Sequence, residues 1–304
     1  MDAILKDLEN KGYEVLYLAA FGSYNYGLEN ENSDFDAKAI INVSEFDLVN
    51  NSHKHNLIKY SFGDCEILNI YEFGEKLKKF EIPYLEILFS DINYVNAGFD
   101  INILKDVANE ILVKNRNKLG DILLLLMKKI YKTFGDSIID FKGKKTYHVI
   151  RFYNLFVKFN SIKRYDKCLR VDVDKETMKI HKMEQILKEN AIEDCEIYID
   201  KMIFYMKHHK CVESPDLIKN IDITISNIIR LYKSYKIKSN LIIQSTNEYE
   251  ILENKVDKQI ITVNNFDIKE DIIHFKNLDS IHWTLKGFQF AVILYTIIFL
   301  MLIC

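Results

Sequence analysis

The sequence lacks the cysteine patterns that mark several protein classes. Its five cysteines are scattered, and no pair has the CxxC spacing. They therefore predict neither a zinc ribbon nor a disulfide framework. A Walker A loop, a GxGxxG fingerprint and a GxSxG elbow are also missing. The common nucleotide-binding loops and the serine-hydrolase motif consequently give no assignment.

An excess of charge of one sign is missing too. The chain has 41 Lys and Arg against 44 Asp and Glu, a net charge of −3, which argues against binding nucleic acid through bulk electrostatics. A local basic groove is still compatible with this balance, because the cationic residues can be distributed unevenly. With 48% apolar and 28% charged residues over 304 positions, we expect a folded protein with one large or two ordinary domains.

The first twelve residues lack the apolar run of a secretory signal, so we expect a cytoplasmic protein. The other end differs, because residues 287–304 contain no charged side chain. Eighteen such residues are at the lower limit for a helix that crosses a bilayer. Two interpretations stay open for this segment: a C-terminal membrane anchor, which gives a membrane contact, and a final helix buried against the helical region.

The spacing of apolar residues predicts an α+β fold with two differently built parts. In the first hundred residues, strand-length apolar runs alternate with helical patterns. We expect strands at residues 13–21, 35–43 and about 64–70, and helices at 2–11, 71–80 and 83–90. From about residue 100 onward, most segments have helical spacing, namely 101–115, 117–135, 144–162, 176–190, 192–210 and 217–235. These patterns predict a domain at 1–100, a helical domain at 101–240 and a C-terminal region at 241–304, whose last part is the apolar segment 287–304.

The segment FGSYNYGLENENSDFDAKAI, residues 21–40, has the pattern of a phosphate and metal site. The first predicted strand ends at Gly22 and Ser23, where glycine allows close backbone approach and serine adds a hydroxyl beside helix N-terminal amides. After a short polar spacer, Asp34 and Asp36 point to the same face if they lie on a strand, since side chains alternate there. Paired carboxylates are the oxygen ligands that Mg²⁺ prefers.

A third carboxylate is expected on a neighbouring strand. The segment DCEILNI supplies two candidates, Asp64 and Glu66, which alternate and therefore share a face. Lys38 is expected on the same strand face as Asp36. It either helps to neutralise phosphate charge or forms a simple ion pair, which is the commoner outcome.

The order of strand, Gly-Ser, polar spacer, Asp-x-Asp and a later acid resembles the DNA polymerase beta-like nucleotidyltransferase superfamily. The segment after Gly63 is similar to the branch of that superfamily associated with RNA-repair ligases. There Asp64 aligns with the family acid, and Pro83 and Glu86 match a later Asn-Pro-x-x-Leu-Glu element. Ile82 replaces the asparagine of that element.

A second match lies at the start of the predicted helix 144–162. Lys144, His148 and Arg151 resemble the Lys-x-x-x-His-x-x-Arg pattern that follows the catalytic domain in this family. At helical spacing the three side chains fall on one face, and the resemblance implies that they bind the nucleotide. The alternative is a solvated basic face with His148 half-buried.

The resemblance implies a Mg²⁺-dependent nucleotidyltransferase whose catalytic domain, residues 1–100, is a mixed sheet with flanking helices. Such an enzyme moves a nucleoside monophosphate from an NTP substrate, such as ATP, to an acceptor hydroxyl on RNA, tRNA, protein or a small molecule. An antiphage or toxin–antitoxin nucleotidyltransferase that modifies tRNA or makes signalling nucleotides fits equally well. The alternative from another class is a catalytically silent binding module with this fold, tethered to a membrane if the C-terminal segment is an anchor.

The resemblance also implies two bound Mg²⁺ ions, for which Mn²⁺ can substitute. The ion that activates the attacking hydroxyl is held by Asp34, Asp36 and Asp64. Glu66 is the alternative to Asp64 in this set. Asp34 and Asp36 hold the second ion on the triphosphate, roughly 3.5–4 Å from the first. Gly22 and Ser23 contact the β- and γ-phosphates.

Overall fold

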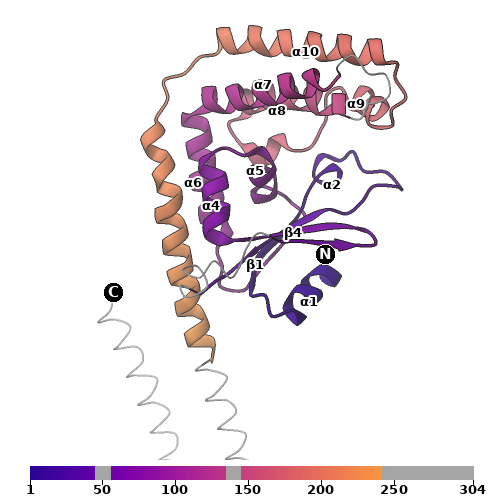
Figure 1. The fold of residues 1–304 in the computed structure, drawn as a ribbon. Helices are drawn as coiled ribbons and strands as arrows, with labels where there is room; N and C mark the ends of the chain where they lie inside the picture. The colour runs from indigo at the N-terminus through magenta and orange to yellow at the C-terminus, as the bar shows by residue number, and fades with distance from the viewer. Residues whose placement is uncertain (45–55, 135–144, 241–304) are drawn as a thin grey trace, which may run out of the picture. The chain divides into compact units, whose positions relative to one another are not determined.

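The computed structural model describes residues 1–44, 56–134 and 145–240, and its fold is α+β (Figure 1). The chain separates into a unit from Met1 to Ile237 and a second unit from Lys238 to Cys304. The strands and the helices up to His208 all belong to the first unit. The domain boundaries predicted at residues 100 and 240 stay predictions.

Five strands form one mixed sheet in the order β3-β4-β2-β1-β5. The central strands β2 and β4 run parallel, and the other neighbours are antiparallel. The strands are β1 Val15–Ala20, β2 Ala37–Ile41, β3 Asn56–Tyr60, β4 Gly63–Asn69 and β5 Asn93–Val95. Every residue of β1 and β2 is buried, as expected for apolar strands that are covered on both faces.

The three predicted strands are confirmed as β1, β2 and β4, whereas β3 and β5 were not predicted. The pattern of apolar residues does not show β3, because this strand has the sequence NLIKY and is mostly exposed at the edge of the sheet. The sequence of an edge strand that is largely exposed to solvent shows only a weak apolar pattern. β5 is three residues long and half-buried, too short for periodicity to show.

The helices follow the predicted segments closely. They are α1 Asp2–Asn10, α2 Ser23–Tyr26, α4 Ile70–Lys78, α5 Ile82–Leu88, α6 Ile101–Lys114, α7 Arg116–Lys132, α8 Thr146–Ile162, α9 Lys175–Lys182 and α10 Lys188–His208, with 3-10 turns at Tyr165–Cys168 and Pro215–Lys219. Residues 220–240 are also helical. The predicted helix 176–190 was wrong in extent: α9 ends at Lys182, and Glu184 has a φ of 57°, a left-handed conformation that a helix does not continue through.

The two faces of the sheet are covered by different clusters. Helix α1 packs Ile4 and Leu8 on one face, against residues such as Leu18 and Ile67. The other face, which carries Ile40 and Leu68, joins one continuous apolar cluster with the helices from α4 to α10. The even-numbered residues of β2 and β4 therefore point toward the helical part of the molecule.

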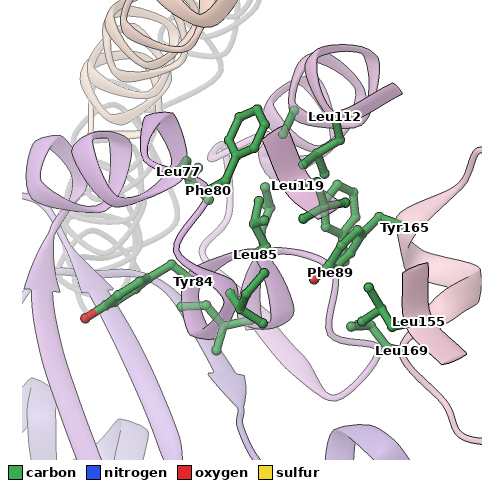
Figure 2. Packing of buried hydrophobic residues seen from close by; sticks show 14 of the residues in the cluster. Leu77, Phe80, Tyr84, Leu85, Phe89, Leu112, Leu119, Leu155, Tyr165 and Leu169 are labelled. Atoms are coloured by element: carbon green, nitrogen blue, oxygen red, sulfur yellow. The ribbon is translucent and has the colours of Figure 1, made fainter. Parts of the chain in front are cut away.

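Figure 2 shows where the helices meet on that second face. Phe80 follows α4, and Leu85 lies in α5; both point into a cluster with Leu112 of α6, Leu119 of α7 and Tyr165. All of these side chains are at most 1% exposed. This packing fixes α5 between the sheet and the helical region, which matters for the site because α5 carries two of its polar side chains.

No helix in the described parts of the chain is long and apolar enough to cross a membrane. The candidate anchor, residues 287–304, lies outside the described residues.

Candidate active site

The Gly-Ser turn lies directly beside Asp36. After β1, the amide of Phe21 donates to the backbone carbonyl of Asp36 at 2.8 Å, which holds the end of β1 against the start of β2. Gly22 precedes α2 with φ 76° and ψ −142°, a conformation that side chains with a Cβ rarely adopt. A Cβ at Gly22 would lie 3.8 Å from Oδ2 of Asp36. The turn and the carboxylate are therefore neighbours, as predicted from the sequence.

Asp36, which immediately precedes β2, lies level with Asp64 near the start of the adjacent parallel strand β4. β2 and β4 pair Ala37 with Cys65, so the preceding residues on each strand are the two acids. The amide of Asp64 donates to Oδ1 of Asp36 at 3.1 Å, and both residues are half-buried. Side chains at the same level of adjacent strands share a face. The fold thus brings together two acids that are far apart in the sequence.

Gly63 makes this approach of the chains feasible. It has a φ of 150°, and a Cβ built on it would overlap the backbone of Phe35. The amide of Phe35 donates to the carbonyl of Phe62 at 2.7 Å, which extends the contact between the two segments beyond the ends of the strands. A larger residue at position 63 would push β4 away from the segment that carries Asp34 and Asp36.

Asp34 differs from the other two acids in its exposure to solvent. It is exposed, in the segment that leads into β2. Among the residues that the structure describes, no three or more His, Cys, Asp or Glu side chains are grouped so as to hold a metal ion. Nor does any described Lys or Arg form a salt bridge with Asp34, Asp36 or Asp64. Two of the three predicted ligands are adjacent, and no described cation of the protein pairs with their oxygens.

Glu66, the other candidate for the third acid, is engaged elsewhere. Its carboxylate forms an ion pair with Lys38, and its Oε1 accepts a hydrogen bond from the hydroxyl of Tyr84 at 2.8 Å. The simple ion pair considered for Lys38 is therefore present. The ammonium also lies 4.5 Å from the ring centroid of Phe21. Burial lowers the pKa of Lys38 to about 8, although the negative charge of Asp36 opposes the shift.

A second polar cluster lies buried behind the Gly-Ser turn. Arg151 of α8 forms a salt bridge with Glu86 of α5 at 2.5 Å, and the two residues are 3% and 1% exposed. The guanidinium carbon lies 3.8 Å from the ring centroid of Tyr26, whose hydroxyl donates to Oε2 of Glu86 at 2.5 Å. The Glu86 and Arg151 segments, singled out separately in the sequence, thus meet in space.

The environment of this cluster fixes the protonation of its tyrosines and of Arg151. Burial raises the pKa of Tyr26 well above its usual value, and it raises the pKa of Tyr147 to about 12. For Arg151, burial opposes the charge, but the neighbouring Glu86 carboxylate holds its pKa above the usual value. Tyr26 therefore stays a hydrogen-bond donor and Arg151 stays cationic at any working pH.

The predicted basic face of α8 is only partly visible. Arg151 is enclosed in the salt bridge with Glu86 and does not belong to a solvated face. His148 is half-buried, with its ring centroid 4.0 Å from that of Tyr147. Lys144 lies outside the described residues. A role for these three residues in nucleotide binding stays a prediction.

Further side chains fix α2, the short helix that starts at Ser23. Ser90 donates to Oδ1 of Asn25 at 2.6 Å, and Nδ2 of Asn25 donates to the carbonyl of Glu86 at 3.4 Å. Asn25 and Ser90 are both buried. Sequence reasoning missed these anchors, because an asparagine and a serine 65 positions apart show no pattern that links them.

No protein-family model and no curated protein sequence matches this chain. The candidate site consists of the Gly-Ser turn and two carboxylates, those of Asp36 and Asp64, at the starts of the inner strands β2 and β4. A third acid, Asp34, lies in the segment that leads into β2.

Proposed function

We propose that this protein is a nucleotidyltransferase of the polymerase beta-like type, which moves a nucleoside monophosphate from an NTP to an acceptor hydroxyl. The observation that carries this proposal is the level placement of Asp36 and Asp64 beside Gly22. Three segments, the end of β1 and the starts of β2 and β4, meet at this point of the sheet. RNA, including tRNA, protein and small molecules are the classes of acceptor to test.

The donor atoms fit Mg²⁺ by their chemistry. The two half-buried aspartates offer carboxylate oxygens, the ligands of hard divalent cations. Asp34 completes the set by turning its carboxylate toward Asp36 when cation and nucleotide bind, which its exposed position allows. Because Glu66 is held by Lys38 and Tyr84, we assign the third position to Asp64.

Bound Mg²⁺ would lower the pKa of the attacking hydroxyl and stabilise the departing pyrophosphate. In the transfer, the acceptor oxygen bonds to the α-phosphorus while the bond from that phosphorus to the pyrophosphate oxygen breaks, and the hydroxyl proton passes to solvent. Gly22 leaves room for the triphosphate beside the backbone. Lys38, next to Asp36, offsets part of the negative charge.

A catalytically silent binding module is the second candidate. It is favoured by one observation: within the described segments, no three or more His, Cys, Asp or Glu side chains are grouped so as to hold a metal ion. A silent module needs the fold and a binding surface, whereas transfer requires the acids to converge on a cation. The two candidates differ in what substitution of the acids does.

Incorporation of label separates them. The purified full-length protein is incubated with each of the four NTPs, labelled at the α-phosphorus, together with RNA, tRNA, protein or small acceptors and Mg²⁺ or Mn²⁺. We expect label in one acceptor with the wild type and none with Asp34→Ala or Asp36→Ala. If the wild type and the double variant behave alike with every NTP and acceptor, the enzymatic proposal fails and the silent module is favoured.

A further inference from the structure

The loop between the Gly-Ser turn and Asp34 is held by the end of helix α9, which lies above α2 in Figure 1. Lys182, the last residue of α9, donates to the carbonyl of Leu28 at 2.6 Å and to Oγ of Ser33 at 3.1 Å. Leu28 lies near the start of the loop that follows α2, and Ser33 is the last residue before Asp34. One ammonium group therefore bridges the two ends of the loop.

Two neighbouring contacts reinforce this attachment. The amide of Val171 donates to the carbonyl of Tyr26 at 3.0 Å. Beyond α9, the sulfur of Met183 accepts from Nδ2 of Asn30 at 3.1 Å. The segment around α9 thus contacts the last residue of α2 and several positions of the loop that follows it.

Inside the loop, Ser33 closes a turn with Asn30. The amide of Ser33 donates to the carbonyl of Asn30, and the amide of Asn30 donates to Oγ of Ser33, both at 2.9 Å. Oγ of Ser33 therefore accepts hydrogen bonds both from the amide of Asn30 and from the ammonium group of Lys182. Asp34 is the next residue, so any displacement of this turn moves the exposed acid directly.

We propose that Lys182 is a positioning residue, which fixes the turn at Asn30–Ser33 and thereby sets the place of Asp34 relative to Asp36. This role rests on the proposed function, because it assigns to the helical region a part in assembling the metal site. It also gives a support to Asp34, which is exposed and has no salt bridge among the described residues. Lys182 acts on Asp34 through Ser33, the residue before it, so no direct contact between Lys182 and Asp34 is needed.

The expected effect of losing this contact comes from the geometry that two-metal transfer requires. Misplacement of a reacting group by about 1 Å can cost on the order of 10²-fold in rate. Lys182→Met keeps the length of the side chain and removes its donors, so kcat should fall about 10- to 100-fold with a smaller change in the KM for the NTP. Lys182→Arg keeps a cationic donor and should restore most of kcat.

The matched control is Lys179→Met on the same helix. Lys179 is exposed and pairs with Glu176, also on α9, at 3.0 Å. Its loss removes a lysine from α9 without touching the loop. A double-mutant cycle with Ser33→Ala adds a second test, since the effects of Lys182→Met and Ser33→Ala on kcat should be less than additive if both act through the same bond.

Hydrogen exchange supplies a readout that needs no activity. In the full-length protein, Lys182→Met should increase amide exchange in peptides that cover residues 28–34, while Lys179→Met leaves it unchanged. Faster exchange with unaltered kcat would overturn the positioning role. Unchanged exchange would overturn the attachment itself.

The outcomes also separate this inference from the proposed function. If the wild type transfers label but Lys182→Met matches Lys179→Met in both kcat and exchange, Lys182 is not a positioning residue and the proposed function stands. If the wild type transfers no label with any NTP and acceptor, the proposed function fails, and the proposed effect of Lys182 on the placement of a catalytic acid fails as well. The exchange measurement then still decides whether Lys182 holds the loop.

Discussion

Two places in this fold hold acidic side chains, and their surroundings are opposite in kind. Glu86 is 1% exposed, and its two oxygens are engaged by Arg151 and Tyr26. At the start of β2 and β4, Asp36 and Asp64 are half-buried and form no salt bridge with any described residue. We call the first group the closed cluster and the second, together with Asp34, the open edge.

The difference shows that the environment of a carboxylate decides whether it has a structural role or stays available to bind a ligand. A carboxylate enclosed with a guanidinium holds elements together, because separating the pair would leave a charge without solvent. Half-buried carboxylates at the ends of strands have oxygens that remain accessible to a ligand from solution. The closed cluster joins α2, α5 and α8 behind the turn, and it therefore supports the open edge.

The largest expected effect is at the open edge. Asp36→Ala should lower nucleotidyl transfer by about 10³-fold or more, because both proposed cations lose a ligand. Glu176→Ala, which removes an exposed acid of α9, is the matched control and should leave transfer unchanged. Initial rates with α-labelled NTP measure the effect. Retention of more than a tenth of the wild-type rate would contradict the role of this acid.

Substitutions in the closed cluster should lower the stability of the folded protein. Glu86→Ala leaves Arg151 buried without its carboxylate and should lower the free energy of unfolding by about 3–5 kcal/mol. The same change at the exposed Glu176 should cost about 0–1 kcal/mol. Urea denaturation of both variants measures the contrast.

A double variant makes that contrast sharper. Combining Glu86→Ala with Arg151→Met should destabilise less than the sum of the single changes, since the unpaired charge is then removed. An additive result would show that Glu86 and Arg151 are not energetically coupled.

The third prediction concerns the choice between the two acids of β4. Asp64→Asn should lower transfer about 100-fold, an effect of the size seen when one electrostatic contact to the reaction is lost. Glu66→Gln, on the same strand face, should act mainly through its partner Lys38 and lower transfer much less. Rates at saturating NTP decide between them. The reverse order would assign the third acid to Glu66.

The smallest effect is a pH dependence at Lys38. Its pKa is lowered to about 8, so its positive charge is present below that pH and is lost as the pH rises through it. The KM for the NTP should therefore rise a few-fold between roughly pH 7 and roughly pH 9. Lys38→Arg should abolish this rise, because arginine stays protonated. An identical KM profile in both proteins would exclude Lys38 as the titrating group.

The sequence predicted the elements that carry the open edge, because their signals are local. A buried strand before Gly22 and an alternating pair of acids before another buried strand are visible within twenty residues or so. Regular spacing likewise predicted most helices. The polar edge strand β3 was missed for the opposite reason, since three of its five residues are exposed and none is fully buried.

The contacts that select among candidate residues could not be predicted. Lys38 pairs with Glu66 across two strands, and Arg151 reaches Glu86 from a different helix. Lys182 contacts a loop about 150 positions earlier in the chain. Such pairings depend on how the helices dock on the sheet, and periodicity within one segment has no information on docking.

Crystals soaked with Mn²⁺ and a non-hydrolysable NTP test the proposed site most directly. We predict an anomalous difference peak at coordination distance from the carboxylates of both Asp36 and Asp64, with Asp34 turned toward it and the triphosphate beside Gly22. Bound nucleotide with no metal peak between Asp36 and Asp64, or a metal held elsewhere in the molecule, would contradict the proposal.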